Sequence, residues 1–389
     1  MDRRKFLKLL AQSSASVGAT VFVEKVWGFP VAFPKSQSGK LYMWGQGVAG
    51  FNSSSSTTIP TPTKVTPSHK WKNVMLGTSS GANSGVAFGT DHKGQIFAWG
   101  NNINGQLGPT AGSVSNPTLF GTLINWQSIS SYSTHSVGLK VDGSIWAWGN
   151  NTYGQFGTAV PTNSSSPIRI GTENTWVKAY AGLGATFALN NAGEVWATGS
   201  STSGYLGAGQ GSGNYPVLTK VPSVIPWSKI SVAKDFVLGI KTDGTLWAWG
   251  SGGDGQLGNA QTLNVSTPIQ IGSLTTWSKV FSSFGVSFAI RNDNTLWAWG
   301  YNGTGNLGIG SIASKSSPVQ VPGSWSEIAP SEEHTIALRT DGTLWGWGRN
   351  DVFQLGVGNT INYSSPIQIG TSLWQSVMTT GTTSAAIRK

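Results

Sequence analysis

Residues 242–258 read TDGTLWAWGSGGDGQLG, and this stretch decides the fold. Its Asp-Gly pair supplies the positive φ angles that a tight hairpin turn requires. The apolar residues Leu246 to Trp249 predict a short strand after that turn, and the glycine-rich run up to Gly258 predicts a second turn. The surrounding sequence predicts three further strands, at residues 227–230, 236–240 and 266–271. The stretch therefore belongs to a unit of four short strands, with no helical period.

The same unit recurs along the chain with a period of about 50 residues. A Trp-Gly pair marks the third strand at Trp44, Trp99, Trp148, Trp249, Trp299 and Trp347, and Thr198-Gly199 stands in the vacant place. Another tryptophan opens each first strand, at Trp71, Trp126, Trp176, Trp227, Trp277, Trp325 and Trp374. Four short strands in each of seven repeats are typical of a β-propeller. We therefore predict an all-β fold, a seven-bladed propeller.

The two ends of the chain carry complementary parts of one blade. The last unit stops after a strand at residues 384–388, before its hairpin turn and third strand. Residues 38–45 read SGKLYMWG and supply both missing pieces. A blade shared between the N- and C-termini closes the ring and leaves no unpaired edge strand. We expect a leader and linker at residues 1–35 and a single propeller domain at 36–389.

The start of the chain resembles a twin-arginine export signal. The residues that carry the resemblance are Arg3, Arg4, Phe6, Leu7 and Lys8. The apolar stretch that follows, up to Val23, is too short and too polar for a stable transmembrane helix. The resemblance implies a protein that folds before export to the periplasm, the cell surface or the medium, with no transmembrane span in the mature chain. The alternative is a mobile basic tail.

A longer pattern places the repeat in a known family. Residues 142–157 read DGSIWAWGNNTYGQFG, and residues 99–108 repeat WGNNINGQLG. With His135-Ser136 and His334-Thr335 before two of the second strands, the pattern resembles the regulator of chromosome condensation (RCC1-type) repeat over residues 38–389. The resemblance implies a seven-bladed propeller in which the histidine position is a structural hydrogen-bonding site.

What the family implies about function is less uniform. Its nuclear members exchange nucleotide on a small GTPase and bind chromatin, while other bacterial members are secreted and include inhibitors of β-lactamases. The exchange loop and histone-binding tail of the nuclear members cannot be identified in this sequence. We therefore do not transfer the exchange activity, because fold alone does not determine function.

The sequence does not bring together the residue types that catalysis or metal binding requires. The chain has no Cys, which excludes a disulfide, a thiolate metal site and a cysteine nucleophile. Glu332 and Glu333 are expected to point to opposite faces of one strand, which makes them a poor acid–base pair. Candidate acids at hairpin turns are expected to cap the turn backbone; they are Asp142, Asp243 and Asp341. We expect no enzymatic activity, catalytic residue, metal site or cofactor.

A periodic charge suggests a binding surface. The net charge is +10, and a basic residue ends the second strand in five of the seven repeats, at Lys140, Lys241, Arg291, Arg339 and Arg388. Blade symmetry predicts that these residues form a ring on one rim, which would attract an anionic partner. The alternative is that each charge keeps a strand end soluble. A less complete basic set comprises Lys178, Lys229 and Lys279.

The loops after the third strands vary most and are rich in Ser, Thr and Asn. Variable polar loops on a rigid ring are common recognition sites. Aromatic residues in these loops are candidate contact anchors, with local packing as the alternative; they are Tyr153, Tyr205, Tyr301 and Phe353.

These patterns favour an exported, non-enzymatic binding or adhesion module at the cell envelope or outside the cell. It would recognise a macromolecular partner through one rim and its loops. The expected partner is a protein or an anionic envelope polymer, and nucleic acid is less favoured. The alternatives are a secreted inhibitor of an enzyme and a guanine nucleotide exchange factor for a small GTPase.

Overall fold

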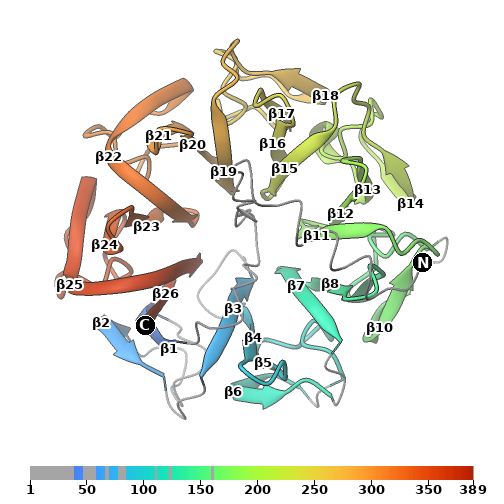
Figure 1. The fold of residues 1–389 in the computed structure, drawn as a ribbon, viewed down its shortest axis with the longest axis horizontal. Coiled ribbons are helices and arrows are strands. Elements are labelled where there is room, and N and C mark those ends of the chain that lie inside the picture. Colours follow the sequence, from blue (N-terminus) through green and yellow to red (C-terminus); the bar gives the residue numbers. More distant parts are fainter. Residues whose placement is uncertain are drawn as a thin grey trace, which may run out of the picture.

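The computed structural model describes residues 39–46, 58–65, 70–77, 85–109, 112–121, 125–158 and 162–388. In these residues seven antiparallel blades surround a central axis, with the first strand of each blade innermost (Figure 1). The predicted seven-bladed propeller is confirmed. The export-signal residues Arg3, Arg4, Phe6, Leu7 and Lys8 lie outside the described residues.

Blades one to four are separate four-stranded sheets. The first contains β3 (Trp71–Gly77), β4 (Val86–Asp91), β5 (Ile96–Gly100) and β6 (Val114–Leu119). The second contains β7 (Trp126–Tyr132), β8 (His135–Lys140), β9 (Ile145–Gly149) and β10 (Ser164–Ile170). The third contains β11 (Trp176–Gly182), β12 (Ala185–Asn190), β13 (Val195–Ser200) and β14 (Asn214–Lys220). The fourth contains β15 (Trp227–Val232), β16 (Phe236–Lys241), β17 (Leu246–Gly250) and β18 (Val265–Gln270), close to the four predicted strands.

Blades five to seven are joined into a ten-stranded sheet. Two long strands connect them, because each runs from the outer edge of one blade to the inner edge of the next (Figure 1). These are β22 (Lys315–Pro330) and β25 (Tyr363–Thr380). The other strands of blades five and six are β19 (Trp277–Ser283), β20 (Val286–Arg291), β21 (Thr295–Gly300), β23 (His334–Arg339) and β24 (Thr343–Gly348).

The seventh blade contains both ends of the described chain. Its middle strands are β26 (Thr383–Arg388) and β1 (Lys40–Gln46), and β2 (Thr58–Lys64) forms its outer edge. The two middle strands pair antiparallel from Lys40 with Arg388 to Gly45 with Thr383. The shared closing blade is therefore confirmed.

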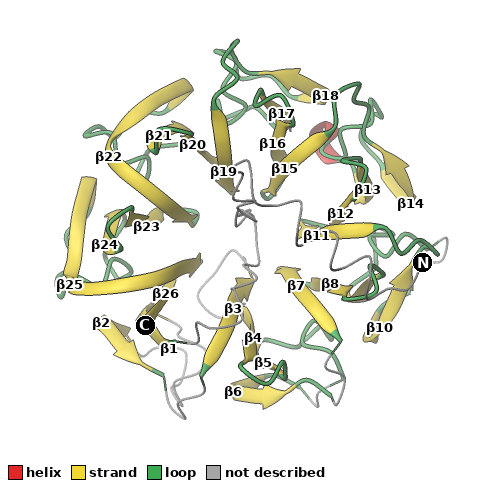
Figure 2. Cartoon of the chain, viewed as in Figure 1, coloured by secondary structure: helices red, strands yellow, loops and turns green. Residues whose placement is uncertain are grey.

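Helix is almost absent from the described residues. The short 3-10 turn η1 (Thr202–Gly204) is drawn red among the yellow strands and green loops of Figure 2. The part of the chain that the structure describes contains no helix with the length and apolarity needed to cross a membrane.

Tryptophan and glycine together join neighbouring blades. The indole Nε1 of the third-strand tryptophan donates to a backbone carbonyl in the preceding blade, as Trp249 does to Tyr205 (3.0 Å) and Trp299 does to Gln256 (2.9 Å). The backbone reaches these indoles at glycines such as Gly258, which has a φ of +78° and where a Cβ would lie 2.7 Å from Trp299 Nε1. Only glycine satisfies both the φ angle and the close approach.

Candidate functional site

The blades give the ring two chemically different faces. The turn face carries the hairpin turns between second and third strands, at residues 141–143, 191–193, 242–244, 292–294 and 340–342. The loop face carries the short turns between first and second strands and the glycine-rich loops after the third strands. Antiparallel pairing separates them: in blade two, Trp126 pairs with Lys140 at one end, and Tyr132 pairs with His135 at the other.

The basic residues that end the second strands lie on the turn face, as expected, against aromatic rings. Lys140, Lys241, Arg291 and Arg339 each contact two indoles, one from the first strand and one from the third. The cationic group lies 3.6 Å from the nearer ring centroid for Lys140, 3.4 Å for Lys241, 3.9 Å for Arg291 and 3.6 Å for Arg339. Arg388 is more exposed and lies 5.6 Å from the Tyr42 ring. This geometry is a cation–π contact repeated from blade to blade.

A relay of hydrogen bonds holds the nearer indole in place. In blade four, the Thr245 hydroxyl donates to Asp243 Oδ1 (2.6 Å), and Trp247 Nε1 donates to the same hydroxyl (2.8 Å). The Thr245 amide also donates to Asp243 (3.0 Å), so this carboxylate caps its turn as predicted. The hydrogen bond from Thr245 holds the pKa of Asp243 below its usual range. Asp142 and Asp341 accept the equivalent bonds in their own turns.

The basic residues of the ring therefore make packing contacts with the indoles of their own blades, on a face that is also open to solvent. Lys241 is only 5% exposed, and each of these turns also carries a carboxylate or other polar side chain. The solubility and partner-binding interpretations of the ring both remain predictions.

The second basic set joins neighbouring blades. Lys229 Nζ donates to the Ser278 carbonyl, and Lys279 Nζ donates to the Ser326 carbonyl (3.0 Å). Burial lowers the pKa of Lys178. The two hydrogen bonds explain Lys229 and Lys279 through packing between blades.

The two histidines that precede second strands also connect blades. Within the buried interior, His135 Nε2 shares a hydrogen bond with the Thr186 hydroxyl (3.3 Å), and His334 Nε2 does so with the Ser384 hydroxyl (2.8 Å). Burial lowers the pKa of His135 to about 4 and that of His334 to about 3. The structural hydrogen-bonding role that the resemblance implied is confirmed by this geometry.

The candidate aromatic anchors lie on the loop face, opposite the basic ring, so the two sets do not form one rim. Tyr153 is 45% exposed, and Tyr301 is half-buried. Tyr205 is 1% exposed, and its hydroxyl donates to the Ala233 carbonyl. The prediction of a contact anchor is wrong for Tyr205, because it packs between blades. Phe353 is half-buried and has a φ of +64°.

Exposed aliphatic side chains on the same loops were missed by the sequence analysis. They are Ile103 (82% exposed), Leu263 (67%), Ile312 (66%) and Ile361 (60%). The signal for them was present, because each is a large apolar residue in a loop rich in Gly, Ser, Thr and Asn.

Acidic residues gather on the loop face at blades four to six. A cleft of about 280 Å³ there is lined by Lys234, Asp235, Ser251, Asp254, Gln256, Phe284, Gly285, Tyr301, Glu332 and Glu333. Burial raises the pKa of Asp235 and of Glu332, and nearby carboxylates raise both further. Glu332 and Glu333 lie in the turn between β22 and β23 and not on a strand, which corrects the expected opposite orientation.

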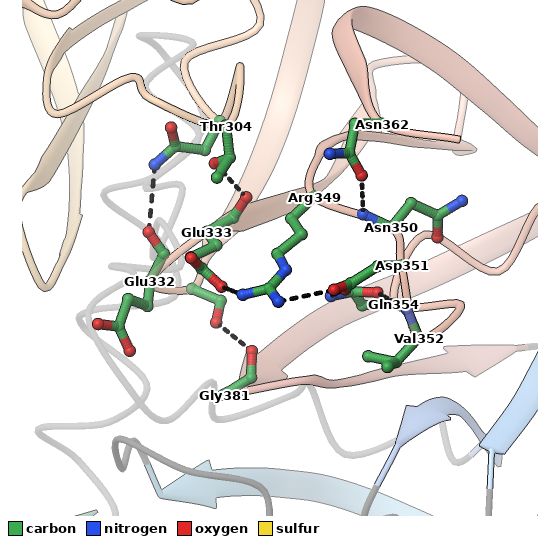
Figure 3. A network of polar contacts seen from close by, with 12 residues as sticks. Thr304, Glu332, Glu333, Arg349, Asn350, Asp351, Val352, Gln354, Asn362 and Gly381 are labelled. Atoms are coloured by element: carbon green, nitrogen blue, oxygen red, sulfur yellow. Dashed lines mark hydrogen bonds and ion pairs between the residues drawn. The ribbon is translucent and has the colours of Figure 1, made fainter. Parts of the chain in front are cut away.

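A polar network fixes the edge of this acidic region. Figure 3 shows Arg349 between Glu333 and Asp351, with an Arg349–Asp351 distance of 2.6 Å. The Thr304 hydroxyl donates to the Glu333 carbonyl (2.8 Å). Hydrogen bonds from Arg349 to these two carboxylates raise its pKa. Glu332 makes no ion pair within this network and faces the cleft.

A second cleft lies beside the most exposed member of the basic ring. It has a volume of about 380 Å³ and is lined in part by Tyr42, Pro62, Trp374 and Arg388. In blades four to six the position of Tyr42 is held by a tryptophan, so a smaller ring stands at this cleft. Among the described residues, no group of three His, Cys, Asp or Glu side chains is placed to hold a metal ion.

Comparison with known families and structures supports the fold. A family model described as the regulator of chromosome condensation (RCC1) repeat matches residues 93–139, 142–189, 243–290, 293–338 and 341–385. A second model of the same description matches residues 126–155. These matches cover more than half of the chain. No curated protein sequence matches the chain at a significant level.

Solved structures with the same fold share little sequence with the chain. Human WBSCR16 superposes with a TM-score of 0.77 at 18% identity, covering 91% of this chain and 99% of that one. Prp20p from Saccharomyces cerevisiae, described with its binding to Gsp1p and histones, gives 0.78 at 17% identity, with 91% and 92% covered. Yeast RCC1 (Prp20) bound to Kap60 gives 0.77 at 16% identity, with 92% and 91% covered.

Proposed function

The chain belongs to the regulator of chromosome condensation repeat family, and from that premise we propose that it is an exported, non-enzymatic module that binds a macromolecular partner on its loop face. The observation that carries this proposal is the set of exposed aliphatic side chains, Ile103, Leu263, Ile312 and Ile361, on loops of one face of the ring. Exposed apolar groups on a soluble surface are common at sites of protein contact. The partner is therefore proposed to be a protein.

The non-enzymatic part of the proposal rests on how the candidate groups are used. His135 and His334 are buried and bond hydroxyls of the next blade. Asp243 and its equivalents cap turns. These groups stabilise the ring. The exposed loops are therefore proposed to bind a partner and not to catalyse a reaction. Export is proposed from the twin-arginine resemblance, and replacing Arg3 and Arg4 by Lys should retain the protein in the cytoplasm.

The fold relatives support protein binding in general terms. Prp20p is described with its binding to Gsp1p and histones, and a second structure holds it with Kap60. At 17% and 16% identity these likenesses establish a shared fold and do not identify a partner for this chain. A secreted enzyme inhibitor is the same proposal with an enzyme as the partner, whereas nucleotide exchange would require residence with a cytosolic GTPase.

The test is capture of partners by the tagged full chain from envelope fractions and culture fluid. The variant Ile312→Ser/Ile361→Ser removes two apolar side chains from the loop face. Its matched control, Val141→Ser/Val224→Ser, removes two exposed ones from the turn face, where Val141 is 67% and Val224 is 100% exposed. We expect the control to retain the partner and the loop-face variant to lose it. Equal capture by both variants would overturn the loop-face assignment.

A further inference from the structure

The charged side chains of the loop face are confined to one sector. In the described loops and turns of blades one to three and blade seven on this face, the residues are uncharged. Blades four to six carry all the charged ones there, namely Lys234, Asp235, Asp254, Lys315, Glu332, Glu333, Arg349 and Asp351. Carboxylates outnumber cations in this sector, although the whole chain has a net charge of +10. The sector is therefore acidic on a basic protein.

The ion pairs within the sector leave one part of it uncompensated. Arg349 pairs with Glu333 and Asp351, at the edge of the sector. The cleft beside them holds Asp235, Asp254 and Glu332 together with a single basic residue, Lys234. Burial is the main cause of the raised pKa of Asp235; Lys234 lowers this pKa and Asp254 raises it, but the effect of burial prevails.

The cleft also has aromatic walls that suit a cation. Phe284 and Tyr301 line it together with the carboxylates. Lys234 Nζ already lies 5.9 Å from the Phe284 ring. Carboxylates supply charge and hydrogen-bond acceptors, and the ring faces supply the weaker cation–π attraction. An ammonium or guanidinium group on a long apolar stem matches this combination.

Exposed aliphatic side chains lie on the loops of the same three blades. Leu263 follows Ser251 and Asp254 in the loop of blade four, and Ile312 follows Tyr301 in the loop of blade five. Ile361 follows Arg349 and Asp351 in the loop of blade six. The sector thus combines an acidic cleft with apolar contact points, as protein-binding surfaces often do.

We propose that the loop face of blades four to six docks a basic segment of a protein partner, with one Lys or Arg side chain entering the cleft between Asp235, Asp254 and Tyr301. The inference rests on the proposed binding function and specifies the chemistry of its partner. Charge complementarity selects this occupant: an acidic segment would meet like charges, and an apolar one would cover the half-buried Asp235 and its neighbouring carboxylates without supplying a positive charge.

The probe for the test is a short fluorescein-labelled peptide of alternating Lys and Leu, with an alternating Glu and Leu peptide for comparison. Binding to the full chain is followed by fluorescence anisotropy at low and moderate salt. The variant Asp235→Asn/Asp254→Asn keeps the side-chain shapes and removes both charges. The matched control, Asp142→Asn/Asp341→Asn, removes the same number of charges from the turn face, where the Asn oxygen can still cap each turn.

We expect the Lys peptide to bind the full chain more weakly as salt rises and the Glu peptide to show little binding. The cleft variant should weaken Lys-peptide binding about tenfold, and the control should change it by less than about twofold. Neutralising Asp235, whose charged form is disfavoured by burial, should not lower the melting temperature. Equal weakening by both variants would show attraction to overall charge and would overturn the proposal, as would equal binding of the Glu peptide.

This outcome is separable from that of the proposed function. Capture of a partner that depends on Ile312 and Ile361 with no binding of the Lys peptide would reject the basic segment and retain the binding module. Binding of the Lys peptide with no captured partner would retain the basic-segment site and reject the proposed binding module.

Discussion

Arg291 lies in the corner between two indoles that are nearly perpendicular, with an angle of 81° between Trp277 and Trp297. Its guanidinium carbon is 3.9 Å from one ring centroid and 4.8 Å from the other. The basic ring seen in the sequence is therefore also a set of packing contacts. Its energetic contribution can be measured one blade at a time.

We predict that Arg291→Met lowers the free energy of unfolding by about 1 kcal/mol, because the apolar stem is kept while the cation–π contacts are lost. Urea unfolding followed by tryptophan fluorescence measures the change. Lys93→Met is the matched control, since Lys93 is an exposed basic residue in a turn on the same face, and it should change stability by less than about 0.5 kcal/mol. Equal effects of the two substitutions would show that the stacking contributes nothing measurable.

His135 and His334 make the fold sensitive to acid. In the folded chain the pKa of His334 is lowered to about 3 and that of His135 to about 4, whereas an unfolded histidine titrates near 6.5. Below pH 6.5 the unfolded chain takes up protons that the folded chain excludes. Stability is therefore complete above that pH and is lost as the pH falls towards the folded values, by about 1.4 kcal/mol per pH unit for each histidine.

This prediction is checked by urea unfolding between neutral pH and about pH 5.5, a range in which most carboxylates stay ionised. His334→Gln retains a side-chain amide for Ser384 and removes one titrating group. We expect the variant to be less stable at neutral pH and to show a shallower loss of stability on acidification. An unchanged pH slope would mean that His334 is not held neutral in the folded chain.

At the scale of strands, the repeat period in the sequence was sufficient to place the blades. It did not show which blades are joined by a continuous strand. The strand limits in blade four differ from the prediction by two residues or fewer. The sequence did not predict that β22 and β25 would each pass through two blades. In β22 the linker itself pairs with a neighbour, since Ser324 lies opposite Thr295. That pairing depends on contacts between blades, and a local pattern of apolar residues does not predict such contacts.

The same limit explains the errors in the candidate site. Tyr205 stands in the repeat position that Gln256 fills in the next blade, where the side chain is buried. Register within the repeat would have assigned it to the interior, whereas its presence in a variable loop suggested exposure. Phe353 stands in the position of Gly255, and both have a positive φ. The acidic cleft was missed because its residues come from turns and loops of three blades and have no sequence period.

At the scale of the whole molecule, the closing blade has the geometry of an interrupted hairpin. The Trp71 amide donates to the Gly39 carbonyl (3.1 Å), and the Trp277 amide donates to the Gly244 carbonyl in the same way (3.2 Å). Gly39 therefore holds the place of the hairpin glycine. Arg388 and Lys40 pair across the strands as the residues on either side of the other turns do. In this register a direct bond from residue 389 to residue 38 completes a turn of the usual length, with Ser38 in the Asp position.

We predict that a circular permutant with residue 389 joined directly to residue 38, and with new ends between Gln210 and Gly211, folds to the same ring. The new ends lie in an exposed loop, where a break disturbs few contacts, and the join adds no strain because it copies a turn that other blades already use. Its melting temperature should lie within about 5 °C of that of the linear chain 38–389, since joining one pair of ends and opening another have opposite entropic effects. Differential scanning calorimetry measures this difference, and circular dichroism confirms the strand content.

A linear chain that lacks residues 38–46 is the contrasting variant; it loses β1, leaves β26 unpaired on one side and should melt far lower. If the permutant melts as low as that truncated chain, the two termini do not close the ring through an ordinary hairpin register.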